Sequence, residues 1–213
     1  MIWLRIVLIL IGYGFGLFQT GYLYGKTKGI DLRTQGSGNT GATNALRVFG
    51  VKGGLIVLLF DALKAFLPCI LVRIIFRDDP YRIVYLVYTG IGAVLGNNYP
   101  AWLRFKGGKG VATTAGWTLA WDPLSNLICI AIFAVLALTT RIASLSSIIA
   151  GLVVIGTAVL YGFRMFEAPF YDPVFVEFFI LVVIAIGLVI LRHRDNIKRL
   201  LNGTENRFGK KKK

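Results

Sequence analysis

Hydrophobic residues in this chain come in long blocks with few charges, separated by short polar segments. A helix needs about 20 apolar residues to cross a hydrocarbon core of about 30 Å, so such blocks indicate membrane spans. We mark seven blocks: Ile2–Leu23, Val51–Phe76, Tyr81–Tyr99, Val111–Ala120, Leu124–Thr140, Leu145–Phe163 and Val174–Leu191. The pattern therefore predicts an all-α, polytopic integral membrane protein with seven transmembrane helices.

The fourth block, Val111–Ala120, is shorter than a full span. We expect it either to be tilted or to start as a half-helix inside the protein, which is tolerated where loops line a polar cavity. The spans would form one domain over residues 1–200, followed by a basic cytoplasmic tail over residues 201–213.

Composition and charge indicate lipids, and not nucleic acid, as the partner. The 213 residues have a mean hydropathy of +0.70, 56% hydrophobic residues and a net charge of +14. The positive charge lies between the apolar blocks, as expected of cationic loops on an anionic lipid surface. Cys69 and Cys129 lie inside apolar blocks without a Cys-x-x-Cys spacing, so we expect inert packing residues, no disulfide and no metal site.

Lysines and arginines are distributed unevenly between the two sides that seven spans define. Eighteen fall on the side of the carboxy terminus, five fall on the other side, and Lys64 lies within a span. Cytoplasmic loops are enriched in Lys and Arg, so the amino terminus is predicted outside and the carboxy terminus in the cytoplasm. The unusual polar loops all fall on the cytoplasmic side, where we expect any chemistry. We interpret Lys210–Lys213 as a patch for the lipid surface.

The first of these loops reads Gly36-Ser37-Gly38-Asn39-Thr40-Gly41-Ala42-Thr43-Asn44, followed by Arg47. Its Gly-x-Gly-x-x-Gly spacing matches a dinucleotide fingerprint, but membrane spans flank the loop where that fingerprint needs a βαβ unit. Glycines let backbone N–H groups approach an anion, and Arg47 adds a planar cationic donor. We interpret the loop as a phosphate cradle, with Thr43 or Asn44 capping the next helix. The alternative is a polar turn that only connects two spans.

A second glycine-rich segment reads Phe105-Lys106-Gly107-Gly108-Lys109-Gly110-Val111-Ala112-Thr113 at the start of an apolar helix. It lacks the spacing of a P-loop, yet two lysines among three glycines still form a cradle for an anion. An ordinary positive-inside flank would explain the lysines but not the glycines. A third segment, Thr139–Ser147, holds serines at a helix entry, where capping is their usual role.

The remaining candidates are a histidine and an intramembrane ion pair. His193, the only histidine, lies between Arg192 and Arg194. We favour a donor to a substrate phosphate over a general base or a solvated flank residue. Asp61 and Lys64 lie mid-span at i, i+3 spacing. Charges inside a membrane are candidates for function, but a pair one turn apart can satisfy itself, so we favour a structural role.

Together these segments resemble the motifs of the bacterial acyl-phosphate:glycerol-3-phosphate acyltransferases (PlsY type). Asp31–Asn44 resembles the family's first motif, Phe105–Thr113 its second and Arg192–Ile197 its third, and the match covers nearly the whole chain. The resemblance implies transfer of a fatty acyl group from acyl phosphate to the 1-hydroxyl of sn-glycerol 3-phosphate. This gives lysophosphatidic acid and phosphate, as the first step of phospholipid biosynthesis.

The resemblance also implies seven spans and a site on the cytoplasmic side of the bacterial plasma (inner) membrane. It implies no metal and no cofactor, and we further expect contact with the soluble enzyme that makes acyl phosphate. Catalytic roles are implied for Ser37, Lys106 and His193, and substrate-binding roles for Asn39, Thr43, Arg47, Ser144, Asn196, Gly36, Gly38, Gly107 and Gly108. We expect direct attack by the glycerol hydroxyl with a substrate phosphate oxygen as base; a nucleophilic Ser37 is the competing route.

One position departs from the family pattern. Where the family usually has Gly-His before the proline that precedes its second motif, this chain reads Gly96-Asn97-Asn98-Tyr99-Pro100. A catalytic role for the family histidine is therefore in doubt in this chain, and His193 is the sole candidate histidine.

Two other functions are alternatives to this one. A membrane transporter of phosphate or phosphate esters is the main alternative, but it should show internal repeats and loop motifs on both faces. A metal-dependent phosphotransferase would need clustered acids on the inner face, where Asp31, Asp195 and Glu205 are scattered.

Overall fold

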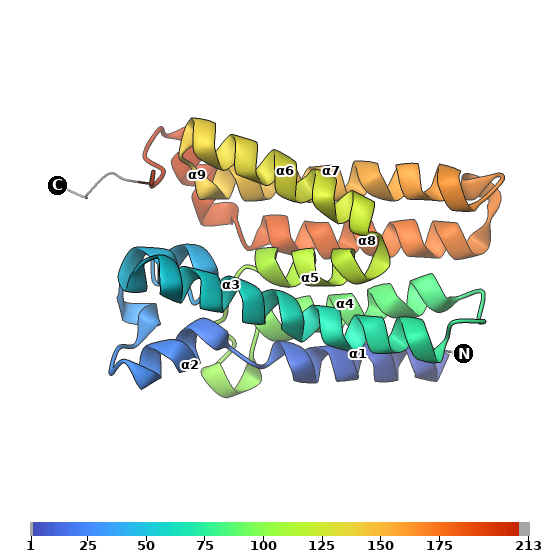
Figure 1. The fold of residues 1–213 in the computed structure, drawn as a ribbon, viewed down its shortest axis with the longest axis horizontal. Coiled ribbons are helices and arrows are strands. Elements are labelled where there is room, and N and C mark those ends of the chain that lie inside the picture. Colours follow the sequence, from blue (N-terminus) through green and yellow to red (C-terminus); the bar gives the residue numbers. More distant parts are fainter. Residues whose placement is uncertain (1, 209–213) are drawn as a thin grey trace. The chain divides into compact units, whose positions relative to one another are not determined.

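The computed structural model describes residues 2–208, and all regular elements within this range are helical. The chain forms two compact units, one up to Trp121 and one from Asp122 onward (Figure 1). The predicted lipid patch Lys210–Lys213 lies outside the described residues. The division into one domain over residues 1–200 and a basic tail remains a prediction.

The first unit contains five α-helices. These are α1 (Ile2–Gly16), α2 (Thr20–Thr27), α3 (Ala42–Ile75), α4 (Arg82–Asn98) and α5 (Val111–Trp121), with 3-10 turns η1 (Leu32–Thr34) and η2 (Ala101–Leu103). The first apolar block is interrupted at residues 17–19, between α1 and α2. Helix α3 begins earlier than its block and bends at Gly50, where φ is +74°. A short helical arm therefore joins the first polar loop to the second span.

Glycines allow the helices of the first unit to approach backbone to backbone. A Cβ atom on Gly12 of α1 would lie 2.0 Å from the carbonyl oxygen of Thr89 in α4. A Cβ on Gly96 would lie 2.3 Å from the carbonyl oxygen of Tyr13. Small residues at such crossings are typical of helices that pack within a membrane. The contact brings the carboxy-terminal end of α4 against the break between α1 and α2.

The second unit is an antiparallel helical group. It contains α6 (Pro123–Thr140), α7 (Ala143–Met165), α8 (Pro173–Leu191) and α9 (Arg194–Leu201), with the 3-10 turn η3 (Pro169–Tyr171). Both α6 and α8 start with the sequence Asp-Pro. The carboxylates of Asp122 and Asp172 accept hydrogen bonds from first-turn N–H groups, and proline at the first helical position needs no such partner. These two dipeptides fix where the helices begin.

All seven apolar blocks contain helix, and five helical segments are long and apolar enough to cross a membrane. The five are Ile2–Thr27, Ala42–Ile75, Pro123–Thr140, Ala143–Met165 and Pro173–Leu191. Helices α4 and α5 are shorter, with 17 and 11 residues. At 1.5 Å per residue α5 extends only about 16 Å, roughly half a bilayer core. The fourth block is thus short, as expected, and seven full spans remain a prediction.

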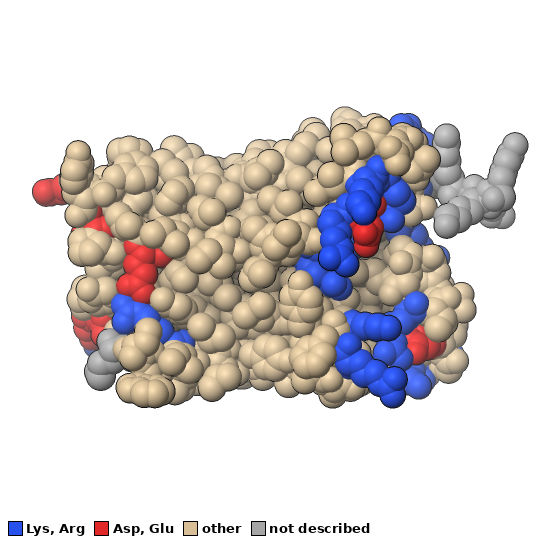
Figure 2. Space-filling view, turned by 180° about the vertical axis from the view of Figure 1, so that it is seen from behind, with Lys and Arg blue, Asp and Glu red and all other residues tan. Residues whose placement is uncertain are grey.

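The surfaces of the helices suit a lipid solvent. In each unit the charged side chains gather toward the helix ends, and uncharged residues cover the helix sides (Figure 2). On α6, for example, Leu127 and Leu138 are 64% and 79% exposed. Soluble monomers rarely expose large contiguous apolar patches, whereas lipid-facing helices do so along their length.

Candidate functional site

The first loop, Gly36–Gly41, is organised by the side chain of Asn44, which is buried in the first turn of α3. The Oδ1 atom of Asn44 accepts a hydrogen bond from the Ser37 backbone N–H at 2.8 Å. Its Nδ2 atom donates to the Asn39 carbonyl oxygen, also at 2.8 Å. The Asn39 side chain in turn accepts from the Gly41 N–H at 2.8 Å. The loop is therefore more ordered than a simple connection between two spans requires.

This scaffold presents three of the predicted site residues. Ser37 and Arg47 are exposed and Thr43 is half-buried. Thr43 and Arg47 are four residues apart on α3, so they lie on one face of the helix. Gly36 and Gly38 have φ values of +60° and +72°, the left-handed region that glycine adopts without strain. The two glycines are thus explained by the loop's backbone shape.

Helix α3 begins at Ala42, and Gly41 is its N-cap residue. The prediction that Thr43 or Asn44 caps this helix is therefore wrong. Both residues lie inside the first turn, and the Asn44 carboxamide is used by the loop instead. Gly41 has no side chain that could cap the helix. The positive end of α3 therefore faces the first loop without a side-chain cap from its N-cap residue.

The second loop, Lys106–Gly110, folds back against the end of α4. The N–H of Gly107 donates to the Asn98 carbonyl oxygen at 3.3 Å, and the N–H of Gly108 donates to the Asn97 carbonyl oxygen at 2.9 Å. A Cβ atom on Gly107 would lie only 2.1 Å from the Asn97 carbonyl oxygen. The glycines therefore permit close backbone contact with α4, while their contact with a substrate stays a prediction.

The surroundings of the second loop combine an exposed cation with unsatisfied buried groups. Lys106 is exposed, and α5 begins directly after the loop. The Asn98 Nδ2 and the Oγ1 atoms of Thr113 and Thr114 are buried and have no hydrogen-bond partner among the described residues. Each such group costs about 1–3 kcal/mol unless a ligand or water satisfies it. Sequence reasoning missed Asn98 and Thr114, because each sits in or beside an apolar block with no distinguishing spacing.

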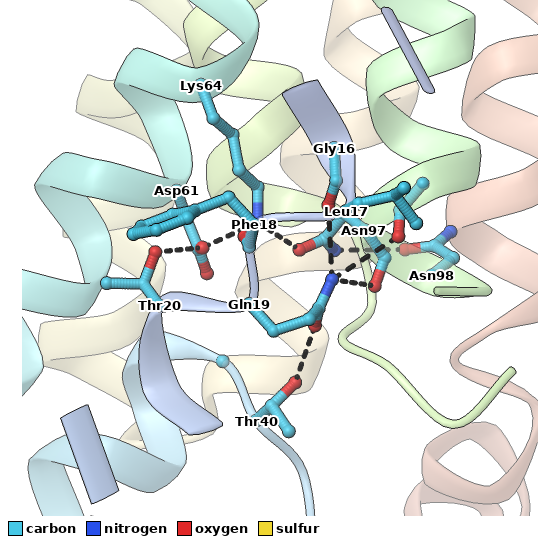
Figure 3. A network of polar contacts seen from close by, with 12 residues as sticks. Gly16, Leu17, Phe18, Gln19, Thr20, Thr40, Asp61, Lys64, Asn97 and Asn98 are labelled. Atoms are coloured by element: carbon cyan, nitrogen blue, oxygen red, sulfur yellow. Dashed lines mark hydrogen bonds and ion pairs between the residues drawn. The ribbon is translucent and has the colours of Figure 1, made fainter. Parts of the chain in front are cut away.

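The intramembrane pair Asp61 and Lys64 forms the ion pair that its spacing predicts. The Lys64 Nζ lies 2.7 Å from the Asp61 Oδ1, and the two side chains are 4% and 8% exposed. An ion pair buried this deeply is stable only where further hydrogen bonds satisfy both groups. The Nζ also donates to the Asn97 Oδ1 at 2.7 Å (Figure 3). This geometry supports the structural interpretation of the pair.

In the second unit, His193 lies between the end of α8 and the start of α9, and its ring is buried. The Nδ1 atom lies 2.8 Å from the carbonyl oxygen of Val189. A carbonyl oxygen only accepts, so Nδ1 carries a proton and donates this bond. The Nε2 atom is then an acceptor in the neutral ring and a donor only in the imidazolium form.

Asn196 is buried in the first turn of α9 and is oriented by an acid that sequence reasoning missed. The Asn196 Nδ2 donates to the Glu205 Oε1 at 3.1 Å, and the Arg199 Nε donates to the Glu205 Oε2 at 2.9 Å. We call His193, Asn196, Arg199 and Glu205 the C-terminal cluster. The Glu205 side chain is only 5% exposed. In the sequence, Glu205 is marked only as an isolated acid that follows Gly203 in a basic segment.

Ser144 lies in the first turn of α7, where its Oγ is buried and has no hydrogen-bond partner in the part of the chain described. The prediction that the serines of this segment cap the helix is wrong, since the N-cap residue is Ile142. The hydroxyls of Ser146 and Ser147 donate back to the carbonyl oxygens of Ile142 and Ala143 at 3.0 and 2.8 Å. Such bonds compete with capping inside a first turn.

The predicted site residues fall into two sets, one in each unit. The first unit holds the first loop, the second loop and the face of α3 that carries Arg47. The second unit holds Ser144 together with the C-terminal cluster. A hydrogen bond from Phe208 N to the Arg141 carbonyl oxygen, at 2.8 Å, ties the segment after α9 to the connection before α7. Ser144 and the C-terminal cluster therefore share one end of the second unit.

The acids near these sets are committed to local partners. The side chain of Arg33 hydrogen-bonds the Asp31 carboxylate and holds the pKa of Asp31 at about 2. Asp31 therefore stays ionised at physiological pH and serves its own turn. Within residues 2–208, no three His, Cys, Asp or Glu side chains are grouped so that they could hold a metal ion. Cys69 and Cys129 are both free and buried.

The chain is similar to known proteins along nearly its whole length. Residues 6–203 match the family model described as glycerol-3-phosphate acyltransferase. The glycerol-3-phosphate acyltransferase of Geotalea daltonii is 39% identical over 207 residues, covering 96% of this chain and 97% of the relative. That of Aquifex aeolicus is 40% identical over 201 residues, covering 94% and 97%.

Two solved structures are also similar. One is a crystal structure of PlsY (YgiH), an integral membrane glycerol 3-phosphate acyltransferase, in its glycerol 3-phosphate form. It has a TM-score of 0.84 and 38% identity, covering 96% of each chain. The other is the lysophosphatidic acid form, with a TM-score of 0.82 and 36% identity, covering 96% of this chain and 95% of that one.

Proposed function

The chain belongs to the glycerol-3-phosphate acyltransferase family, and from this premise we propose that it moves a fatty acyl group from acyl phosphate to the 1-hydroxyl of sn-glycerol 3-phosphate. The products are lysophosphatidic acid and inorganic phosphate. The pair of glycine-rich loops carries the proposal, because each precedes a helix start and has an exposed cation, Arg47 or Lys106, beside it. Both substrates bear phosphate, the group that such loops and helix starts bind.

The chain is an all-helical integral membrane protein, and we propose the finer topology of seven spans. Helix α4, with 17 residues, extends about 25 Å and nearly matches a bilayer core. Helix α5 acts as a half-helix that starts at the second loop. The excess of Lys and Arg on one side supports an outer amino terminus, a cytoplasmic carboxy terminus and a site facing the cytoplasm. The location is the bacterial plasma membrane, in contact with its lipids.

The proposed reaction needs no covalent enzyme intermediate, because acyl phosphate is already an activated anhydride. The glycerol 1-hydroxyl oxygen attacks the acyl carbon and forms the new ester bond. The bond between the acyl carbon and the bridging phosphate oxygen breaks, and its electron pair leaves with the phosphate. The hydroxyl proton passes to an oxygen of that phosphate. The protein positions the substrates and stabilises the charge of the leaving group.

We assign Arg47, Lys106, His193 and Asn196 mainly to glycerol 3-phosphate, and Ser37, Thr43 and Ser144 to the acyl-phosphate end. The exposure of Arg47 and Lys106 supports a role in meeting a charged substrate from the aqueous side. The buried, unsatisfied Oγ of Ser144 supports a ligand contact. His193 acts as a donor through Nε2, which requires the imidazolium form because Nδ1 already carries a proton.

Ser37 distinguishes direct transfer from a covalent route. Its backbone N–H donates to the Asn44 Oδ1, and its side chain is exposed. We expect Ser37→Ala to lose activity because it binds the acyl-phosphate donor more weakly. In the wild-type protein we expect no acyl-enzyme. Intact-protein mass spectrometry after rapid quenching checks this, and an acyl group on Ser37 would contradict direct transfer.

The proposed activity is tested with purified protein, palmitoyl phosphate, glycerol 3-phosphate and a metal chelator. We expect lysophosphatidic acid to form. Lys106→Ala should lower kcat/KM by about 100-fold through loss of one charged donor. Lys52→Ala is the matched control, because it removes an exposed cation of the same unit outside both loops. A folded wild-type sample that yields no lysophosphatidic acid would overturn the proposal. We further propose that a soluble enzyme supplies the acyl phosphate.

A further inference from the structure

A buried polar network centres on Lys64, which belongs to neither glycine-rich loop (Figure 3). At its centre, the Lys64 Nζ donates hydrogen bonds to the Asp61 Oδ1, the Asn97 Oδ1 and the Phe18 carbonyl oxygen, at 2.7, 2.7 and 2.8 Å. An ammonium group has three N–H donors, so all of them are used within the protein. The Asp61 Oδ1 also accepts from the Thr20 Oγ1 at 2.8 Å. The network thus joins α3, α4 and the break between α1 and α2.

Gln19, which is 1% exposed in that break, extends the network to both loops. Its Oε1 accepts a hydrogen bond from the Thr40 Oγ1 of the first loop at 3.3 Å. Its Nε2 donates to the Asn97 carbonyl oxygen at 3.2 Å. The same carbonyl oxygen accepts from the Gly108 N–H of the second loop at 2.9 Å. A continuous path of hydrogen bonds therefore runs from one loop to the other.

The path is anchored at a rigid point of the fold. The Gln19 Nε2 also lies within hydrogen-bond distance of the carbonyl oxygens of Gly16 and Gly96, at 3.1 and 3.3 Å. These glycines lie where α1 and α4 touch backbone to backbone. Helices in such contact cannot shift relative to each other without a clash. Gln19 and Asn97 are therefore held at the tightly packed contact between α1 and α4.

We propose that Gln19, Lys64, Asp61 and Asn97 are positioning residues that hold the first loop and the second loop at one separation. This inference rests on the proposed function, because it gives that separation a purpose: two phosphate groups held by the loops keep the spacing that acyl transfer needs. Gln19 bonds the Thr40 hydroxyl and the Asn97 carbonyl oxygen, which also accepts from the Gly108 N–H. Lys64, paired with Asp61, holds the Asn97 side chain. The four side chains therefore act through the loops, without any contact to the reacting atoms.

The network also gives position 97 a role. The Asn97 Oδ1 accepts from the Lys64 ammonium, and the Nδ2 donates to the Asn98 Oδ1 at 3.2 Å. The Nδ1 atom of a neutral imidazole occupies the same place along a side chain and also accepts. Position 97, where the family pattern usually has histidine, is therefore filled by a group that accepts from Lys64 and does not act as a base.

The coupling is measured by hydrogen–deuterium exchange on the full-length protein, independently of activity. We expect Gln19→Leu to increase exchange in both loops together, including the bonded amides of Ser37 and Gly108. The matched control is Thr89→Val, which removes a buried hydroxyl that bonds only within its own helix. The control should leave both loops unchanged. Increased exchange in one loop alone, or in neither, would overturn the proposal.

Kinetics give the second readout. Each loop keeps its own donors, so we expect Gln19→Leu and Asn97→Leu to lower kcat by about 100-fold while KM for glycerol 3-phosphate changes little. Asn97→His should retain most of the activity, because the Nδ1 atom of a neutral imidazole still provides an acceptor for Lys64. If Asn97→Leu does not fold, Gln19→Leu and Asn97→His decide the matter. An inactive Asn97→His protein with ordered loops would contradict the role given to position 97.

The two proposals can fail separately. If the wild-type protein makes no lysophosphatidic acid but Gln19→Leu still loosens both loops, the proposed function is wrong and the coupling stands. If the wild type is active and Gln19→Leu leaves both loops and kcat unchanged, the coupling is wrong and the proposed function stands.

Discussion

The two units support their predicted site residues in different ways. In the first unit, Asn44 shapes the first loop locally, and further hydrogen bonds join residues far apart in the chain: Thr40 and Gln19 are 21 positions apart, Lys64 and Asn97 are 33, and Gln19 and Asn97 are 78. In the C-terminal cluster, the partners of His193, Asn196 and Arg199 lie 4, 9 and 6 positions away. The loops of the first unit therefore combine local bonds with bonds that depend on helix packing, whereas these three bonds of the C-terminal cluster are all local.

The largest effect on stability is expected at the buried ion pair of Asp61 and Lys64. Lys64→Met leaves the Asp61 carboxylate buried and unpaired, which should lower the free energy of unfolding by about 3–5 kcal/mol. The double variant Lys64→Met/Asp61→Leu removes both charges and should lose less. Denaturant titrations in detergent micelles measure both. Equal losses in the two variants would show that the pair does not carry the stability of this region.

A smaller and local effect is expected in the C-terminal cluster. Glu205→Gln replaces a charged acceptor of two hydrogen bonds by an amide whose oxygen can still accept one of them, so about 1.5–3 kcal/mol is lost. We expect weaker binding of glycerol 3-phosphate, with exchange rates raised around α9 and unchanged in the first loop. The control is Asp195→Asn, whose pairing with Arg194 at 3.9 Å is exposed. Faster exchange in the first loop of Glu205→Gln would show that the two units do not differ in this way.

The protonation of His193 gives a test by pH. Because Val189 holds the Nδ1 proton, donation from Nε2 to a phosphate requires the imidazolium form. Affinity for glycerol 3-phosphate should therefore be present at low pH and be lost as pH rises through the titration of the ring. The KM for glycerol 3-phosphate should rise with pH in the wild type, and this rise should be smaller in His193→Gln. A KM that falls as pH rises would favour a general base.

The smallest effect is expected at the exposed pair Arg77 and Asp78. Their side chains are 76% and 85% exposed, and surface pairs of this kind contribute about 0–1 kcal/mol. Asp78→Asn should leave the free energy of unfolding and the activity within error. A large loss would mean that local surface contacts matter more in the first unit than the buried network implies.

The helices could be predicted well from the sequence, because long apolar blocks constrain them strongly. The interruption at residues 17–19 could not, since Gln19 looks like one polar residue in an apolar block until Thr40 and Asn97 reach it. The helix after the first loop was expected, with Thr43 or Asn44 as its cap, but its bend at Gly50 was not. Gly50 is one of several glycines in this segment, so the sequence does not single it out as the bend.

The candidate site was predictable where its residues share a motif. Asp61 and Lys64 could be paired from their spacing, but the further partners of Lys64, Phe18 and Asn97, come from other helices. Both predictions of capping were wrong, since Asn44 and Ser147 bond elsewhere. Glu205 was missed because a single sequence does not reveal that a turn brings it back onto Asn196.

We propose that this chain makes lysophosphatidic acid from acyl phosphate and does not carry phosphate esters across the membrane. Vesicles containing the purified protein and palmitoyl phosphate, given radiolabelled glycerol 3-phosphate, distinguish the two. We expect label in lysophosphatidic acid, with one phosphate released per molecule formed. Unchanged glycerol 3-phosphate accumulating in the vesicle lumen, with no labelled lipid, would contradict it.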